Sequence, residues 1–166
     1  MMQWLNRLLV RGEPTLSEAS ARDAAAIAKL HAASFRHGWS DGEIERLLLE
    51  RNIVAHRAMS GRAMTGRALQ GFILSRLAAG ETEILSVAVS STRRGRGLAR
   101  ALLNLHLRRL AGLGARTVVL EVDEDNEPAR RLYRRAGFRE VGRRPAYYQQ
   151  GRDKAATALV LRRDLV

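Results

Sequence analysis

The sequence of 166 residues contains no cysteine. Disulfide bonds, thiolate metal ligands and a cysteine nucleophile are therefore excluded. The four histidines are scattered without His-x-x-x-His spacing, so the pattern predicts no metal site. No apolar run approaches the roughly 20 residues that span a bilayer, and Asn6 and Arg7 interrupt the apolar start of the chain, unlike a signal peptide. These absences favour a cytoplasmic protein.

Acidic residues are also scarce, with 17 Asp and Glu against 29 Lys and Arg, for a net charge of +12. Such an excess favours contact with phosphate groups on a cofactor, RNA or another acidic surface. The alternative is a solvated surface rich in arginine, because no basic motif interleaved with aromatic residues is present. Length and a hydrophobic content of 46% predict a single folded domain over 1–166, with residues 1–13 as an additional amphipathic segment.

Hydrophobic periodicity and turn residues predict a mixed α/β architecture. Capping boxes at Ser20–Asp23 and Ser40–Glu43 open two successive helices, the first over 24–35. A third helix covers 98–113, with an apolar face of Leu98, Leu102, Leu103, Leu105, Leu107 and Leu110, and a fourth runs from Pro128 to Gly137. Strands are predicted over 15–19, 52–58, 69–77, 83–89, 117–122, 138–148 and 156–162.

A glycine turn joins the strand at 83–89 to the third helix. Gly95 and Gly97 let the main chain approach a ligand closely, and free N–H groups at the start of the helix attract an anion. Arg94 and Arg96 can meet phosphate oxygens. The turn lacks the third glycine of a dinucleotide fold and the Gly-Lys-Ser/Thr of a P-loop, which excludes both. An ordinary flexible turn before a helix is the remaining alternative.

Two polar side chains are candidates for proton transfer. Glu121 interrupts an apolar strand and faces away from Leu120 and Val122, where its carboxylate could take a proton from an amine. The alternative is a solvated residue or an ion pair with one of the arginines. Tyr133 lies on an apolar helical face, where it is either a core residue or an acid whose hydroxyl protonates a leaving thiolate.

Two motifs resemble the GNAT acetyltransferases: Arg94-Gly95-Arg96-Gly97-Leu98-Ala99, and Asn126-x-x-Ala129-x-x-Leu132-Tyr133 followed by Gly137-Phe138. The resemblance implies the GNAT fold, a mixed and mostly antiparallel twisted sheet flanked by helices. It also implies acetyl-CoA as acetyl donor, without a metal, and Tyr133 as general acid. The implied acetyl-CoA contacts are Val87, Ala88 and Val89 along the pantetheine arm, Arg94, Gly95, Arg96, Gly97, Leu98, Ala99 and Arg100 at the pyrophosphate, and Asn126.

A narrower resemblance is to bacterial ribosomal-protein-alanine N-acetyltransferases. The segments that carry it are 35–40 with Trp39, 83–89, 120–122 and 143–148. It implies that Glu121 is the base, that Trp39, Glu83, Tyr147 and Tyr148 shape the peptide site, and that the substrate is the N-terminal α-amine of a protein. A ribosomal protein beginning with alanine or serine is the implied partner of an enzyme that is a monomer or weak dimer. Glu83 is a second candidate base.

Two other functions remain open. The same acetyl donor could serve a lysine side chain, a polyamine or an aminoglycoside, and a cationic small molecule of this kind would need an acidic acceptor site. The chain could instead be a non-catalytic module that binds RNA or the ribosome, which the joint presence of Glu121 and Tyr133 disfavours.

Overall fold

A computed structural model describes residues 13–61, 66–145 and 157–165. Its centre is a seven-stranded sheet with the strand order β1-β2-β3-β4-β5-β7-β6. The strands are β1 (Thr15–Glu18), β2 (Ile53–Ser60), β3 (Ala68–Leu77), β4 (Thr82–Val89), β5 (Thr117–Asp123), β6 (Arg139–Arg144) and β7 (Ala158–Asp164). The helices are α1 (Ala24–Ser34), α2 (Asp41–Leu49), α3 (Leu98–Gly112) and α4 (Glu127–Arg135), with short 3-10 turns η2 (Ala21–Asp23) and η3 (Ser91–Arg93).

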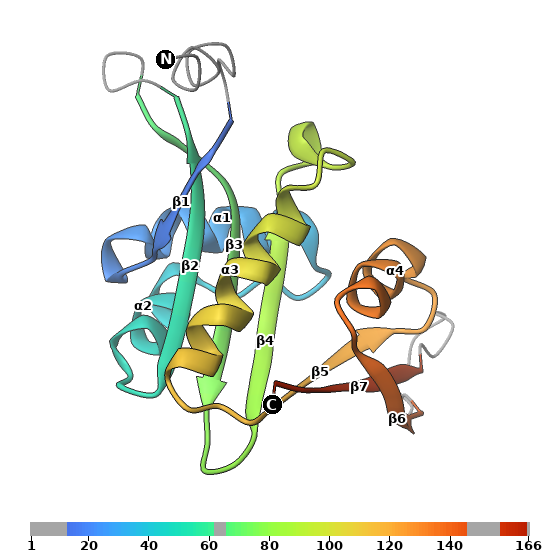
Figure 1. Cartoon of the computed structure of the whole chain (residues 1–166). Helices are drawn as coiled ribbons and strands as arrows, with labels where there is room; N and C mark the ends of the chain where they lie inside the picture. Colours follow the sequence, from blue (N-terminus) through green and yellow to red (C-terminus); the bar gives the residue numbers. More distant parts are fainter. Residues whose placement is uncertain (1–12, 62–65, 146–156, 166) are drawn as a thin grey trace, which may run out of the picture.

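Neighbouring strands are antiparallel except for β4 and β5, which are parallel and joined through α3. This parallel pairing covers only Thr82 with Val118 and Glu83 with Val119. Beyond these pairs the two strands diverge, and β5, β7 and β6 turn away from β4 (Figure 1). The upper part of β4 therefore has no strand partner on the side of β5.

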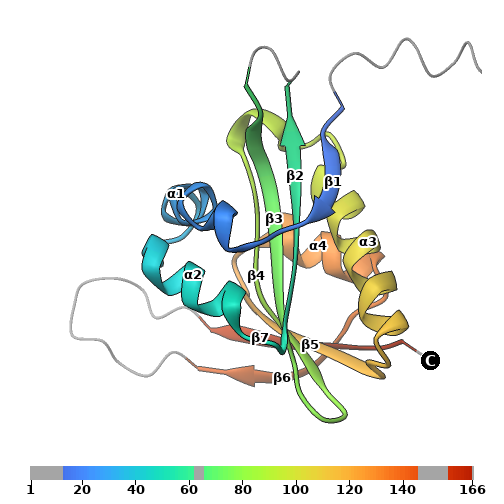
Figure 2. The same cartoon turned by 90° about the vertical axis from the view of Figure 1, so that its left-hand side faces the viewer.

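Helices cover both faces of the sheet (Figure 2). On one face α1 and α2 pack over an apolar cluster that includes Ile27, Ile44 and Phe72. On the other face α3 and α4 share a larger cluster that includes Leu102 and Leu120. The mixed, mostly antiparallel sheet flanked by helices that the sequence predicts is thus confirmed.

Local sequence signals explain where the helices begin. Ser20 and Asp23 form a capping box before α1, and Ser40 and Glu43 form another before α2, as predicted. Asn126 caps α4, because its Oδ1 accepts the N–H of Ala129 at 3.2 Å. These bonds satisfy backbone donors that the first turn of a helix leaves free.

Several predicted boundaries shift by a few residues. The first helix ends at Ser34 rather than residue 35, and the strand predicted over 138–148 is observed as Arg139–Arg144, while residues 146–156 lie outside the described part of the chain. The predicted amphipathic segment falls almost entirely on residues 1–12, which also lie outside it. On α3, Leu105 is only half-buried, and the inward position beside it is taken by His106, which is completely buried.

Helix α3 lies unusually close to the sheet at Gly71. A Cβ atom at this position would be 2.9 Å from Cδ1 of Leu102 and 3.1 Å from the carbonyl oxygen of Ala88. Both distances are shorter than ordinary van der Waals contact. The glycine therefore sets how closely α3, which carries the glycine turn at its start, approaches β3 and β4.

Candidate active site

The glycine turn between β4 and α3 presents unpaired backbone donors. Gly95 and Gly97 have φ values of +72° and +79°, and Gly97 is the N-cap of α3 in the left-handed conformation. Within the described residues, none of the N–H groups of residues 95–100 donates to a protein acceptor. Unpaired donors at the positive end of a fifteen-residue helix make an anion-binding site. This geometry is suited to a pyrophosphate group, and the resemblance assigned the pyrophosphate to this turn, including Leu98, Ala99 and Arg100.

Arginines surround this turn in different ways. Arg94 folds back so that its Nε donates to the carbonyl oxygen of Val89 at 3.3 Å, which ties the turn to the end of β4. Arg96 and Arg100 are exposed, and no acidic residue occurs between Glu83 and Glu121 in the sequence. The local charge is therefore positive, which favours a bound anion.

The strand before the turn has a free edge where β4 and β5 diverge. Val87, Ala88 and Val89 pair with β3 on one side, and no described strand pairs with them on the other. An edge of this kind offers main-chain hydrogen bonds to an extended ligand. The predicted pantetheine-binding residues therefore lie where such an arm could pair with the main chain.

A β-bulge interrupts β4 just beyond the last residue that pairs with β5. Ser75 pairs with Ile84 and Leu74 pairs with Ser86, so Leu85 is an extra residue in the ladder. The bulge breaks the alternation of side chains between the two faces of the sheet. Ile84 and Val87 are three positions apart and would face opposite sides in a regular strand, yet both pack on the α3 side. The Ser86 hydroxyl, at the same bulge, is buried without a hydrogen-bond partner within the described residues. The bulge leaves backbone polar groups of β4 outside the ladder.

Both candidate bases lie on the same face of the sheet. Glu83 pairs with Val119, and Glu121 follows Val119 by two positions, which places all three side chains on the face opposite Leu120. Glu83 lies in the paired part of the two strands, whereas Glu121 lies where they have diverged. The Glu121 side chain is 41% exposed, and its Oε1 lies 3.0 Å from Nε of Arg144, so the ion pair considered from the sequence is present.

Tyr133 lies on the other face of β5, in the apolar cluster that contains Leu120 and Val122. Its ring packs edge-on against Phe138 with the centroids 5.7 Å apart. Burial raises the pKa of the Tyr133 hydroxyl to about 12, so the group stays protonated at neutral pH. Within the described residues nothing hydrogen-bonds to this hydroxyl, so it is free to act as a donor. The candidate base and the candidate acid therefore flank β5 from opposite faces.

Trp39 is held in the α1–α2 loop by a buried histidine of α1. Nδ1 of His31 accepts the backbone N–H of Trp39 at 3.1 Å, and the two rings stack with centroids 4.5 Å apart. His31 is buried, and burial lowers its pKa, an effect that the nearby Glu43 partly offsets. A neutral His31 can accept the hydrogen bond, whereas its protonated form cannot.

A pocket of about 340 Å³ lies beside Trp39 and is lined by Trp39, Glu43, Arg46, Leu47 and Glu50. Its two carboxylates already have partners. Glu43 accepts from Ser40, and Glu50 contacts Arg76 at 3.4 Å. The pocket therefore offers little free negative charge to a cationic small molecule.

The structure thus brings the predicted residues of β4, the turn and β5 to one junction. Asn126 follows β5 closely, and its Oδ1 is occupied by the helix cap, which leaves the amide NH₂ for a ligand. Tyr147 and Tyr148 lie outside the described residues. The bulge at Leu85 and the contact of His31 with Trp39 escaped sequence reasoning, since both are defined by pairing between residues that the fold brings together.

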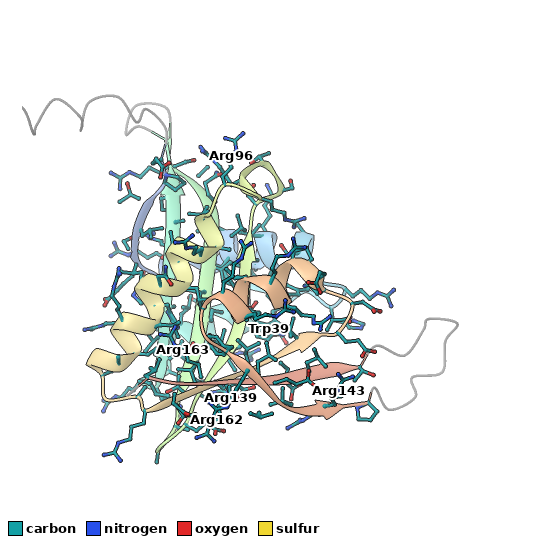
Figure 3. The ribbon with its side chains drawn as sticks, turned by 45° about the vertical axis from the view of Figure 1, so that its right-hand side comes forward. Trp39, Arg96, Arg139, Arg143, Arg162 and Arg163 are labelled. Carbon is teal, nitrogen blue, oxygen red and sulfur yellow. The ribbon has the colours of Figure 1, made fainter. Side chains whose placement is uncertain are left out.

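The arginines are divided between opposite parts of the molecule. Arg139, Arg143 and Arg162 lie on β6 and β7, away from Arg96 at the glycine turn (Figure 3). Arg139 and Arg162 contact Asp164 at 3.2 and 3.1 Å, which neutralises part of the charge on these strands. Among residues 13–61, 66–145 and 157–165, no three His, Asp or Glu side chains gather as metal ligands, and no helix is long and apolar enough to cross a membrane.

Diverging parallel strands beside a glycine turn with unpaired donors form a site suited to a phosphorylated ligand where β4 meets α3. The model of the acetyltransferase (GNAT) family matches residues 24–138, and the chain belongs to this family. The family predicted from the two sequence motifs is confirmed.

Relatives within the family act on different acceptors. Over 91 residues the chain is 40% identical to N-alpha-acetyltransferase RimI of Mycobacterium tuberculosis, covering 55% of this chain and 54% of RimI. Over 59 residues it is 46% identical to the mycothiol acetyltransferase of Mycobacteroides abscessus, covering 36% of this chain and only 20% of that protein. The ribosomal-protein-S18-alanine N-acetyltransferase of Escherichia coli superimposes with a TM-score of 0.79 at 22% identity, over 92% of this chain and 94% of that one, which shows a shared fold.

Proposed function

We propose that the protein transfers the acetyl group of acetyl-CoA to the N-terminal α-amine of a protein. The observation that carries the proposal is the set of unpaired N–H groups at residues 95–100, beside the free edge of β4. Similarity to RimI over about half of each chain supports an α-amine as acceptor. A ribosomal protein beginning with alanine or serine is the substrate we propose.

The residues of this chain divide the reaction between them. Acetyl-CoA, when bound, supplies the acetyl thioester. The turn at 95–100 holds its pyrophosphate, the edge of β4 at Val87–Val89 pairs with the pantetheine arm, and Asn126 contacts that arm. Backbone groups released from the ladder at Leu85 stabilise the negative charge that develops on the carbonyl oxygen. Trp39, Glu83, Tyr147 and Tyr148 shape the acceptor site.

Glu121 and Tyr133 carry the protons. The amine nitrogen attacks the carbonyl carbon, and Glu121 accepts the proton that the amine loses. As the carbon–sulfur bond breaks, Tyr133 donates its hydroxyl proton to the sulfur. We favour Glu121 over Glu83 as base because Glu121 lies where β4 and β5 have separated, whereas Glu83 lies between paired strands.

Acetylation of a peptide panel tests the activity and its acceptor together. Purified protein is incubated with acetyl-CoA and peptides that begin with alanine, serine or other residues, and with purified ribosomal proteins, and the products are weighed as intact masses. We expect one added acetyl group at the N-terminal amine. Failure of every protein and peptide substrate, despite acetyl-CoA binding, would contradict the proposed acceptor.

Matched variants of the two carboxylates test the base. We expect Glu121→Gln to lower kcat by about 100-fold or more, because loss of a general base typically costs about 10²–10⁴ in rate. Glu83→Gln is the comparison, and because Glu83 shapes the acceptor site we expect it to raise the KM of the peptide while kcat changes little. A drop in kcat for Glu83→Gln alone would assign the base to Glu83 instead.

A small-molecule amine is the second candidate acceptor, and the similarity to mycothiol acetyltransferases favours it. That similarity covers 36% of the chain. The partnered carboxylates in the pocket beside Trp39 argue against a cationic small molecule. Including lysine, a polyamine and an aminoglycoside in the same mass assay separates the candidates, since each product has its own mass.

A further inference from the structure

Two buried histidines and a serine form a hydrogen-bonded chain that the proposed reaction does not use. His56 on β2 is 3% exposed, and His106 on α3 and Ser75 on β3 are completely buried. Nδ1 of His56 lies 2.7 Å from Nδ1 of His106, and Nε2 of His106 lies 2.7 Å from Oγ of Ser75. The chain therefore connects three elements through the interior of the molecule.

When both rings are neutral, the hydrogen-bonded chain has a single direction throughout. Only one hydrogen atom fits between two Nδ1 atoms at this distance, so one ring donates and the other accepts. His106 then takes the opposite role towards Ser75, and the whole chain runs in one direction or the other. Burial lowers the pKa of both histidines, that of His106 to about 3, which keeps the rings neutral at physiological pH.

This hydrogen-bonded chain of polar side chains lies in an otherwise apolar part of the core. The residues around it on α3 and β3 are apolar, including Leu102, Leu103 and Ile73. Burying polar groups among them has a desolvation cost that hydrogen bonds only offset, whereas aliphatic side chains would pack there without that cost. Hydrogen bonds, unlike apolar contacts, fix the distance and direction between the groups that they join. The hydrogen-bonded chain therefore fixes how β2, α3 and β3 are placed relative to one another.

The hydrogen-bonded chain ends at the bulge of the candidate active site. Ser75 is the residue at which the pairing of β3 with β4 shifts, opposite Ile84. The middle member of the hydrogen-bonded chain, His106, lies on α3 eight residues beyond Leu98, and the other end is His56 on β2. Eight residues of helix span about 12 Å, so His106 ties the helix that begins at the glycine turn to the strand that supports the bulge.

We propose that His56, His106 and Ser75 are positioning residues that hold α3 and the β4 bulge at a fixed separation. Acetyl-CoA bound at both the glycine turn and the bulge must have its thioester at a fixed position along β4. The hydrogen-bonded chain sets that position. The catalytic part of this inference rests on the proposed acetyl transfer. The structural part of the inference, which is that the hydrogen-bonded chain controls the bulge, is independent of the proposed acetyl transfer.

Four variants separate positioning from ordinary packing. His106→Leu removes both hydrogen bonds, Ser75→Ala removes the one at the bulge, and His106→Gln keeps a group that can reach Ser75. Leu110→Ala is the matched control, because Leu110 is equally buried on α3 but makes no polar contact. Each protein is measured for kcat, for KM of acetyl-CoA, for thermal midpoint and for amide hydrogen exchange at residues 84–87.

We expect Ser75→Ala and His106→Leu to lower kcat about tenfold or more, with KM for acetyl-CoA within about twofold, since small displacements of reacting groups are costly. Exchange at residues 84–87 should accelerate in both variants. His106→Gln should recover part of kcat relative to His106→Leu. Leu110→Ala should lower the thermal midpoint while kcat and exchange at the bulge stay unchanged.

The proposal is overturned if Ser75→Ala keeps both kcat and slow exchange at the bulge, or if Leu110→Ala loses as much kcat as His106→Leu. Ser75→Ala removes a single atom and keeps the test usable if His106→Leu does not fold. Absence of acetyl transfer in the unmodified protein would refute the proposed function, and exchange at residues 84–87 would still decide whether the chain controls the bulge.

Discussion

Acidification should destabilise this protein through His106. The ring is completely buried, and burial lowers its pKa from 6.5 to about 3 in the folded chain. The unfolded chain takes up a proton as the pH falls below about 6.5, whereas the folded chain does not. The contribution of the neutral ring to stability is therefore complete above about pH 6.5 and is lost progressively as the pH falls towards 3.

The size of the effect follows from the two pKa values. Between about pH 8 and about pH 5, His106 alone should lower the free energy of unfolding by about 2 kcal/mol. That is a large part of the roughly 5–15 kcal/mol that stabilises a typical domain. In urea it corresponds to a shift of the midpoint by roughly 1 M. Burial also lowers the pKa of His31 and His56, which adds to the loss in the same direction.

Urea unfolding of the unmodified protein and of His106→Gln, each at about pH 8 and about pH 5, measures the contribution of His106 to the free energy of unfolding. Gln does not titrate, so the loss of stability on acidification should be smaller by about 2 kcal/mol in the variant. The histidine ring signals in an NMR spectrum at about pH 5 should show His106 still neutral. Equal losses in the two proteins, or a protonated His106 in the folded state at that pH, would refute the reasoning.

Two further predictions concern the site. Gly97→Ala should weaken acetyl-CoA binding, measured by calorimetry, because the φ of +79° at the N-cap strains any side chain by about 1–2 kcal/mol. Gly112→Ala on the same helix is the control. A Cβ atom there would meet nothing within 4 Å, so this variant should bind acetyl-CoA normally. Tyr133→Phe should lower kcat in the peptide assay while leaving the thermal midpoint nearly unchanged, because its hydroxyl has no described partner. Full turnover of this variant would exclude Tyr133 as the acid.

Local sequence signals determined the elements and the family of this protein. Ser20 and Ser40 form capping boxes with Asp23 and Glu43, so the starts of these helices could be read from a few positions of the sequence. Gly95 and Gly97 marked the turn because the chain needs left-handed backbone there. Alternation alone placed Glu121 opposite Leu120 and Val122, and burial agrees.

Tertiary structure decided what depends on residues far apart in the chain. The end of pairing between β4 and β5, the bulge at Leu85 and the partner of each buried histidine are set by strand register and helix packing, which leave no local pattern. No local pattern could name the partner of His106, because that partner, His56, lies 50 positions away on β2. The sequence offered candidate residues for binding and reaction, and only the folded chain shows how β4 and β5 separate beside them.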